Sequence, residues 1–132
     1  MRTFARIFLI ALVLGTAIAH LRADEPETVV ITLHAKPGKA VELERVVAKH
    51  FETARRLKLV QEAGHLTMRG IEQNDQVYMM DVFTWRDASI PDAAPKEIQA
   101  IWAEMNALVE PRGGRPGLTI DQVSIVSRSQ ER

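Results

Sequence analysis

Residues 76–86, Q-V-Y-M-M-D-V-F-T-W-R, decide the fold of this chain. β-Branched and aromatic side chains in a partial alternation are typical of a strand. Successive side chains of a strand point to opposite faces of its sheet. Apolar side chains occur on both faces, at Val77, Met79, Phe83 and Trp85 on one and at Tyr78, Met80 and Val82 on the other. We therefore expect a central strand that helices cover on one face and that a second sheet or a partner subunit covers on the other.

Three further strands and two amphipathic helices are predicted around this stretch. Strand patterns occur at residues 29–35, 65–72 and 118–126. Apolar residues recur at intervals of three and four from about residue 40 to 63, where Gly64 is the predicted stop. The same spacing returns from Pro95 to about residue 110. The polar residues 73–75 predict a tight turn, and hence a hairpin between the second and third strands.

The predicted order of strand, helix, strand, strand, helix and strand is that of the ferredoxin-like α+β fold. It implies a four-stranded antiparallel sheet with both helices on one face, in one domain at residues 28–127 with a polar tail at 128–132. The other face would leave more apolar surface in water than monomers usually expose. A twin subunit would cover that face, so we expect a two-fold homodimer.

The amino terminus has the pattern of a signal peptide. Arg2 and Arg6 precede an apolar run of about 13 residues that ends at Ala19, which is short for a membrane span. Small residues at Ala17 and Ala19 predict cleavage before His20, and a second candidate cleavage site follows Ala23. We expect residues 1–19 to be removed and the protein to be periplasmic or secreted. The alternative is an uncleaved anchor that holds a periplasmic domain.

Composition excludes several classes of function. Removal of residues 1–19 takes away two arginines and leaves a formal charge of −2. A near-neutral domain of this kind lacks the basic surface that nucleic acid or an anionic membrane would attract. The chain contains no cysteine, which excludes disulfides, thiol catalysis and cysteine-ligated zinc. We expect no contact with nucleic acid, and none with the membrane after cleavage.

The chain resembles the dimeric α+β barrel superfamily, and within it the antibiotic-biosynthesis-monooxygenase-like group. The resemblance is carried by the strand order, by the turn K-P-G-K at residues 36–39 before a long helix, and by Trp85 at the end of the third strand. It implies homodimers with small-molecule pockets between each sheet and its helices. Activities in the group include cofactor-independent oxygenation of aromatic polyketides and quinols, and heme degradation.

Two departures from the group's pattern limit what the resemblance implies. Members often carry a glutamate two residues before the tryptophan, where this chain has Phe83. Members often carry a histidine at the start of the following helix, where this chain has I-P-D-A-A-P at residues 90–95. Heme-degrading members ligate iron through that histidine, so its absence argues against heme degradation. We expect no cofactor.

His34 is the candidate catalytic residue. A neutral imidazole near the end of the first strand, on the same face as Thr32, could accept a proton from a phenolic or quinol substrate. The alternative is a partly exposed histidine without a catalytic role, because the sequence supplies no residue to orient it. Further candidates would line a pocket for a small apolar or aromatic ligand. These pocket candidates are Thr32, His65, Tyr78, Trp85 and Trp102.

No metal site is expected, because His34, His50 and His65 lie on different predicted elements without the close spacing of a metal site. Arg69 and Asp81 fall on neighbouring strands of the predicted hairpin, and a buried Asp81 would need a partner of this kind.

The sequence thus predicts an exported dimeric α+β barrel protein with a small apolar pocket. It would be a cofactor-independent monooxygenase of an aromatic or quinol-type molecule, or else a non-catalytic binding protein or structural dimer of the same fold.

Overall fold

The computed structural model describes residues 25–129 of the chain. The predicted signal peptide lies outside these residues. Within them, no helix is long and apolar enough to cross a membrane. The regular elements, in chain order, are β1 (Glu27–His34), α2 (Ala40–Arg56), β2 (Leu66–Ile71), the 3-10 turn η1 (Gln73–Asp75), β3 (Val77–Trp85), the 3-10 turn η2 (Ile90–Ala93), α3 (Lys96–Leu108) and β4 (Leu118–Gln122).

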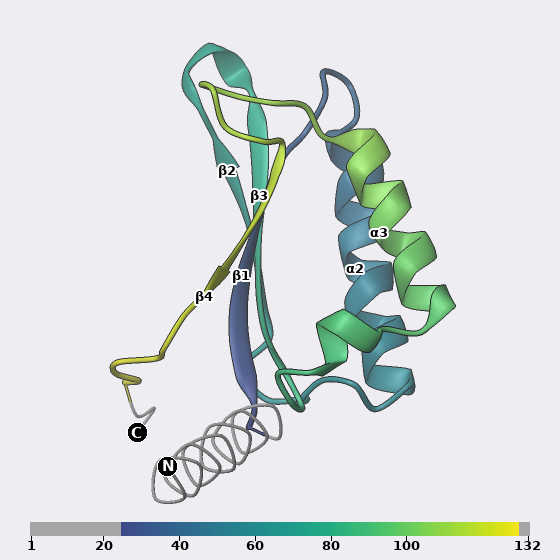
Figure 1. Ribbon diagram of the computed structural model, residues 1–132. Coiled ribbons are helices and arrows are strands. Elements are labelled where there is room, and N and C mark those ends of the chain that lie inside the picture. Colours follow the sequence, from purple (N-terminus) through teal and green to yellow (C-terminus); the bar gives the residue numbers. More distant parts are fainter. Residues whose placement is uncertain (1–24, 130–132) are drawn as a thin grey trace, which may run out of the picture.

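The four strands form one antiparallel sheet in the order β2-β3-β1-β4, and α2 and α3 lie side by side on one of its faces (Figure 1). This arrangement confirms the predicted ferredoxin-like α+β fold. The central strand is β3, which pairs with β1 on one side and with β2 on the other. Trp85 at its end faces the helices together with Phe83 and Met79, and all three side chains are buried.

The core lies between the helices and the odd-numbered residues of β1 and β3. Val29, Ile31 and Leu33 of β1 are buried there against the apolar stripes of α2 and α3. The strand register places Ile31 opposite Asp81 and Leu33 opposite Met79, so the alternation of the sequence corresponds directly to the two faces of the sheet.

The first helix is shorter than predicted. It ends at Arg56, and Lys58 adopts a left-handed backbone conformation with a φ of 58°. The N–H groups of Lys58 and Leu59 donate to the carbonyl oxygens of Arg55 and Ala54, which is the hydrogen-bond pattern of a Schellman motif. The prediction that the helix continues to about residue 63 was therefore wrong. The chain leaves the helix early because residues 59–61 pair with the end of β3, with a bridge between Val60 and Trp85.

The last strand is also shorter than the predicted 118–126. Its regular pairing with β1 ends at Gln122, and Val123 donates one further hydrogen bond to the carbonyl oxygen of Thr28. Since β1 begins at Glu27, the residues after Val123 have no strand of residues 25–129 beside them. Val126 is 97% exposed as a result.

No helix of residues 25–129 lies on the second face of the sheet (Figure 1). We call it the open face; its side chains are the even-numbered residues of β1, β2 and β3 and the odd-numbered residues of β4. Leu66 is 53% exposed on this face and Met68 is 39% exposed. Val30, Met80 and Val82 beside them are half-buried. The apolar residues that the sequence placed on a second face are thus present there and are partly in contact with solvent.

Candidate functional site

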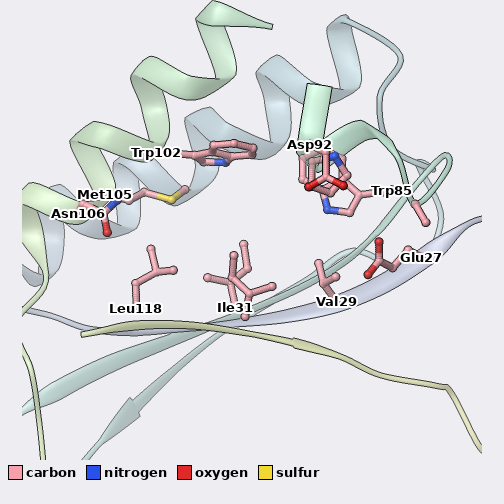
Figure 2. A pocket seen from close by; sticks show the side chains of 12 residues that line it. Glu27, Val29, Ile31, Trp85, Asp92, Trp102, Met105, Asn106 and Leu118 are labelled. Atoms are coloured by element: carbon pink, nitrogen blue, oxygen red, sulfur yellow. The ribbon is translucent and has the colours of Figure 1, made fainter. Parts of the chain in front are cut away.

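A cavity of about 460 Å³ lies between the helix-covered face of the sheet and α3 (Figure 2). Small-molecule pockets in proteins commonly have volumes in this range and mostly apolar walls. The floor consists of side chains from β1 and β4, and the roof comes from α3 and from the loop around η2. The lining residues are Glu27, Val29, Ile31, Trp85, Ala88, Pro91, Asp92, Trp102, Met105, Asn106, Leu118 and Ile120.

Two tryptophans form the aromatic wall of the cavity. Trp85 reaches it from the end of β3, and Trp102 reaches it from the apolar stripe of α3. Their ring centroids are 6.4 Å apart and their planes are nearly perpendicular, at 85°. Tryptophan faces of this kind suit a flat apolar ligand, because they offer a large contact area that is rigid before the ligand arrives.

The position of Trp102 is held by a histidine beneath it. The indole Nε1–H of Trp102 donates a hydrogen bond of 2.9 Å to Nε2 of His50, which is completely buried on α2. Phe83 and Trp85 also pack edge-on against the imidazole ring. Burial, and to a smaller extent the neighbouring His65, lower the pKa of His50 to about 4. The imidazole is therefore neutral at physiological pH, and its Nε2 lone pair is available to accept from the indole.

Polar groups occur at the ends of the cavity. Glu27 from β1 and Asp92 from η2 lie at the end that contains Trp85, and Asn106 lies at the other end beside Met105 (Figure 2). Glu27 is directly opposite Trp85 in the register of β1 and β3, which places both side chains on the same face of the sheet. The cavity is thus an apolar slot with two carboxylates at one end and an amide at the other.

The structure divides the predicted site residues between the two faces of the sheet. Trp85 and Trp102 lie together in the wall of the cavity. Thr32, His34 and Tyr78 lie on the open face, outside this cavity. A catalytic His34 would therefore serve a different place in the molecule from the tryptophans, and its role as a proton acceptor stays a prediction.

His34 does have an orienting partner, which the sequence alone did not reveal. Its Nδ1 lies 2.8 Å from Oε1 of Glu72, and Arg112 donates to the same carboxylate oxygen at 2.9 Å. Arg112 also donates to the carbonyl oxygen of Ala35 and to Glu110. These bonds connect the glycine-rich loop after α3 to the end of the sheet. Contacts among His34, Glu72 and Arg112 consequently hold this loop to the sheet, and they also orient the imidazole of His34.

His65 belongs to a second polar cluster, next to α2. Its Nε2 lies 2.8 Å from Oδ1 of Asp81, and Thr67 donates to the same oxygen at 2.6 Å. The imidazole of His65 stacks on Phe51 with a ring separation of 3.6 Å. Asp81 is only 1% exposed, and both contacts are made to its Oδ1, while its Oδ2 is buried without a hydrogen-bond partner among residues 25–129.

The expected pairing of Arg69 with Asp81 was wrong. Thr67, and not Arg69, is opposite Asp81 in the strand register, and Arg69 pairs with Glu44 on the exposed side of α2. Within residues 25–129, no group of three or more potential ligands could hold a metal ion.

Two carboxylates in the lining, Glu27 and Asp92, and the buried His50 behind the wall are not among the site residues that the sequence predicts. The spacing of His50 from Val46, Val47 and Phe51 puts it within reach of the core. The signal that could have identified His50 was that spacing, and no comparable signal pointed to the two carboxylates.

The chain has the fold of several solved structures. SnoaB, a cofactor-independent oxygenase from Streptomyces nogalater, superposes with a TM-score of 0.60 at 16% identity, over 81% of this chain and 99% of SnoaB. A candidate antibiotic biosynthesis monooxygenase from Caulobacter crescentus superposes with a TM-score of 0.52 at 19% identity, over 82% and 96% of the two chains.

A dimeric ferredoxin-like protein of unknown function from Jannaschia superposes with a TM-score of 0.52 at 14% identity, over 76% and 99% of the two chains. No protein-family model matches the sequence, and no curated protein matches it significantly. These similarities establish the ferredoxin-like fold of antibiotic-biosynthesis-monooxygenase-like proteins for this chain, and they establish the fold alone.

Proposed function

We propose that this protein is an exported homodimer that binds a flat apolar small molecule between its sheet and α3. The observation that carries the proposal is the cavity of about 460 Å³ with Trp85 and Trp102 in its wall. Its volume accommodates a two- or three-ring aromatic molecule. Because the Nε1–H of Trp102 is bonded to His50, the wall is organised before binding, which reduces the entropy lost when a ligand enters.

The open face supports the dimer. Leu66, Met68, Met80 and Val82 expose or half-expose an apolar surface in the middle of a four-stranded sheet. A second copy would remove this surface from water by packing its own open face against it. The Jannaschia protein of the same fold is described as dimeric, which agrees with this arrangement.

Export rests on the sequence of residues 1–19. A full-length chain produced in a Gram-negative bacterial host should be recovered from the periplasm in a shortened form. Its intact mass should correspond to cleavage after Ala19 or after Ala23. Recovery of the full-length mass from the membrane fraction would instead support an uncleaved anchor.

Calorimetric titration of the mature dimer with indole tests the binding function. We expect the variant Ile120→Trp to abolish binding, because Ile120 lies in the wall of the cavity and is 61% exposed, so a larger side chain can fill the slot without disturbing the core. The matched control is Ile71→Trp, at an isoleucine that is 69% exposed on β2 and outside the cavity. Equal binding by both variants would show that the ligand does not occupy this cavity.

A second candidate function is cofactor-independent oxygenation of such a ligand, supported by the shared fold with SnoaB. In this chemistry an activated methylene of the substrate becomes a carbonyl: one atom of dioxygen enters the product and the other leaves as water. Oxygen consumption with 1,8-dihydroxyanthrone, corrected for the reaction without protein, tests it. Activity that Ile120→Trp removes would establish turnover in the cavity, and no consumption above the uncatalysed rate would leave a binding protein.

The variant His34→Ala tests the catalytic role predicted from the sequence. A general base typically contributes a factor of about 100 or more to the rate, so a fall of at least about tenfold would support His34 as the proton acceptor. We expect turnover in the cavity to remain unchanged, because His34 lies on the open face.

A further inference from the structure

The end of the cavity near Trp85 carries two carboxylates that have no side-chain partner among residues 25–129. Neither Glu27 nor Asp92 forms a side-chain ion pair or a side-chain hydrogen bond with another residue in the range 25–129. Most other acidic side chains near the helices are paired, for example Glu104 with Lys49 and Glu97 with Arg56. The two carboxylates are thus available to interact with a molecule inside the cavity.

Among the described residues, the lining of the cavity contains no compensating positive charge. None of its residues is lysine, arginine or histidine, and its remaining polar side chain is the neutral amide of Asn106. The two carboxylates therefore make this end of the slot negative, and water screens part of their charge because Asp92 is exposed and Glu27 is half-buried. An anionic ligand would meet repulsion at this end, whereas a cation would be attracted.

Trp85 strengthens this preference. It lies across from Glu27 in the strand register, and Figure 2 shows it at the same end of the cavity as Asp92. Tryptophan has the most favourable ring face for a cation, and carboxylates beside it add direct charge pairing. The same end of the slot thus combines two kinds of recognition for an ammonium group, and the apolar floor formed by Val29 and Ile31 would hold an attached ring.

We propose that the cavity selects aromatic amines in their protonated form, with the ammonium group between Glu27 and Asp92 and the ring against Trp102. This inference rests on the proposed binding function and specifies the class of ligand. It excludes aromatic carboxylates of the same size as preferred ligands.

Four probes with one indole ring test the selection by calorimetric titration of the mature dimer. Indole has no polar tail, tryptamine has a cationic tail, tryptophol has a neutral hydroxyl, and indole-3-propionate has an anionic tail. We expect tryptamine to bind about tenfold or more tightly than indole-3-propionate, with tryptophol between them. The advantage of tryptamine should decrease as salt is added, since the charges lie near the mouth of the slot.

Charge-removing variants locate the source of the preference. Glu27→Gln and Asp92→Asn should each reduce the ratio of tryptamine to indole-3-propionate affinity severalfold, and should leave the affinity for indole within about twofold. Asp121→Asn is the matched control, because Asp121 is an exposed carboxylate on the open face. It changes the net charge equally but lies on the other side of the sheet, so its ratio should match that of the parent protein.

The possible results separate the two proposals. If indole and tryptamine both fail to bind, the proposed binding function is wrong. If indole binds but the tail charge has no effect, or if Asp121→Asn changes the ratio as much as Glu27→Gln, the binding function stands and the selection of amines is wrong.

Discussion

The two faces of the sheet are built from the same strands but are completed in different ways. On the helix-covered face, Phe83 and Met79 are fully buried, and Asp81 and His50 each use one polar atom to contact another element of the same chain. The Oδ2 atom of Asp81 and the Nδ1 atom of His50 are buried without a partner among residues 25–129. On the open face, Leu66 and Met68 remain in contact with solvent, and no described element covers them. Elements of the same chain therefore cover the first face, whereas within residues 25–129 the second face stays partly in contact with solvent.

The two faces also carry different histidine–carboxylate pairs. His65 and Asp81 lie against α2, where the carboxylate is buried and the imidazole stacks on Phe51. His34 and Glu72 lie at the edge of the open face, where both side chains retain some exposure and Arg112 shares the carboxylate. Because Asp81 is buried, loss of His65 should destabilise the fold, whereas the His34–Glu72 pair remains accessible to solvent.

Two neighbouring residues on β3 should show the largest difference in stability between the two faces. Phe83→Ala should lower the free energy of unfolding by about 4 kcal/mol, because it leaves a cavity in a packed core. Val82→Ala, one residue away on the open face, should cost the monomer about 1 kcal/mol or less. Urea denaturation at protein concentrations low enough to dissociate a dimer measures both. Equal losses would mean that the open face is as well packed within one chain as the helix-covered face.

The buried histidine on the helix-covered face makes stability depend on pH. The pKa of His50 is about 4 in the folded protein, against 6.5 for an ordinary histidine in the unfolded chain. Between these values the unfolded chain binds a proton that the folded protein does not, so stability should fall as the pH is lowered through this window. The full loss of stability is about 3 kcal/mol, and it is reached as the pH approaches the pKa of His50 in the folded protein.

Denaturation at a series of pH values measures this contribution against the variant His50→Gln, which cannot titrate but can still accept a hydrogen bond from Trp102. The difference in stability between the two proteins should change across the window. A constant difference from pH 6.5 to pH 4 would contradict a buried neutral imidazole.

A charge on the open face tests whether a second copy covers it. Val82→Lys should raise the dimer dissociation constant by about a hundredfold or more, because the ammonium group would be buried without a partner in the interface. The monomer should remain folded. Val41→Lys is the control, since Val41 is an exposed apolar residue on α2. Sedimentation measures the dimer dissociation constant of both variants. A dimer that survives Val82→Lys would exclude this face as the interface.

The smallest effect concerns the hydrogen bond behind the cavity wall. Trp102→Phe removes the donor to His50 and leaves a buried acceptor unsatisfied, which should cost about 1 kcal/mol of stability. Tyr78→Phe removes a hydroxyl donor from an aromatic ring on the open face. This variant should change stability by less than about 0.5 kcal/mol. Thermal denaturation of both variants compares the two positions, and an unchanged Trp102→Phe variant would mean that the bond contributes nothing.

The order of the elements and the faces of the strands could be predicted from the sequence. Alternation at 76–86 places Phe83 and Val82 on opposite faces whatever the partners are, because the side-chain period of a strand is two. The stripe of α3, with Ile98, Ile101 and Met105, likewise follows from the helical period. These properties are local, so the residues themselves determined them.

Contacts between distant residues determined where α2 and β4 end. They also determined which residues contact Asp81 and which side chains line the cavity. Lys58 is an unusual residue for a left-handed position, and it adopts that conformation because Val60 pairs with Trp85 of β3. Glu27 and Asp92 are distant in the chain and come to the same end of the cavity through the β1–β3 register and the η2 turn. The sequence by itself determined which residues are apolar and which face each strand residue occupies. The tertiary structure alone decided which polar groups meet, because a meeting between distant residues depends on strand register and helix packing and not on local spacing.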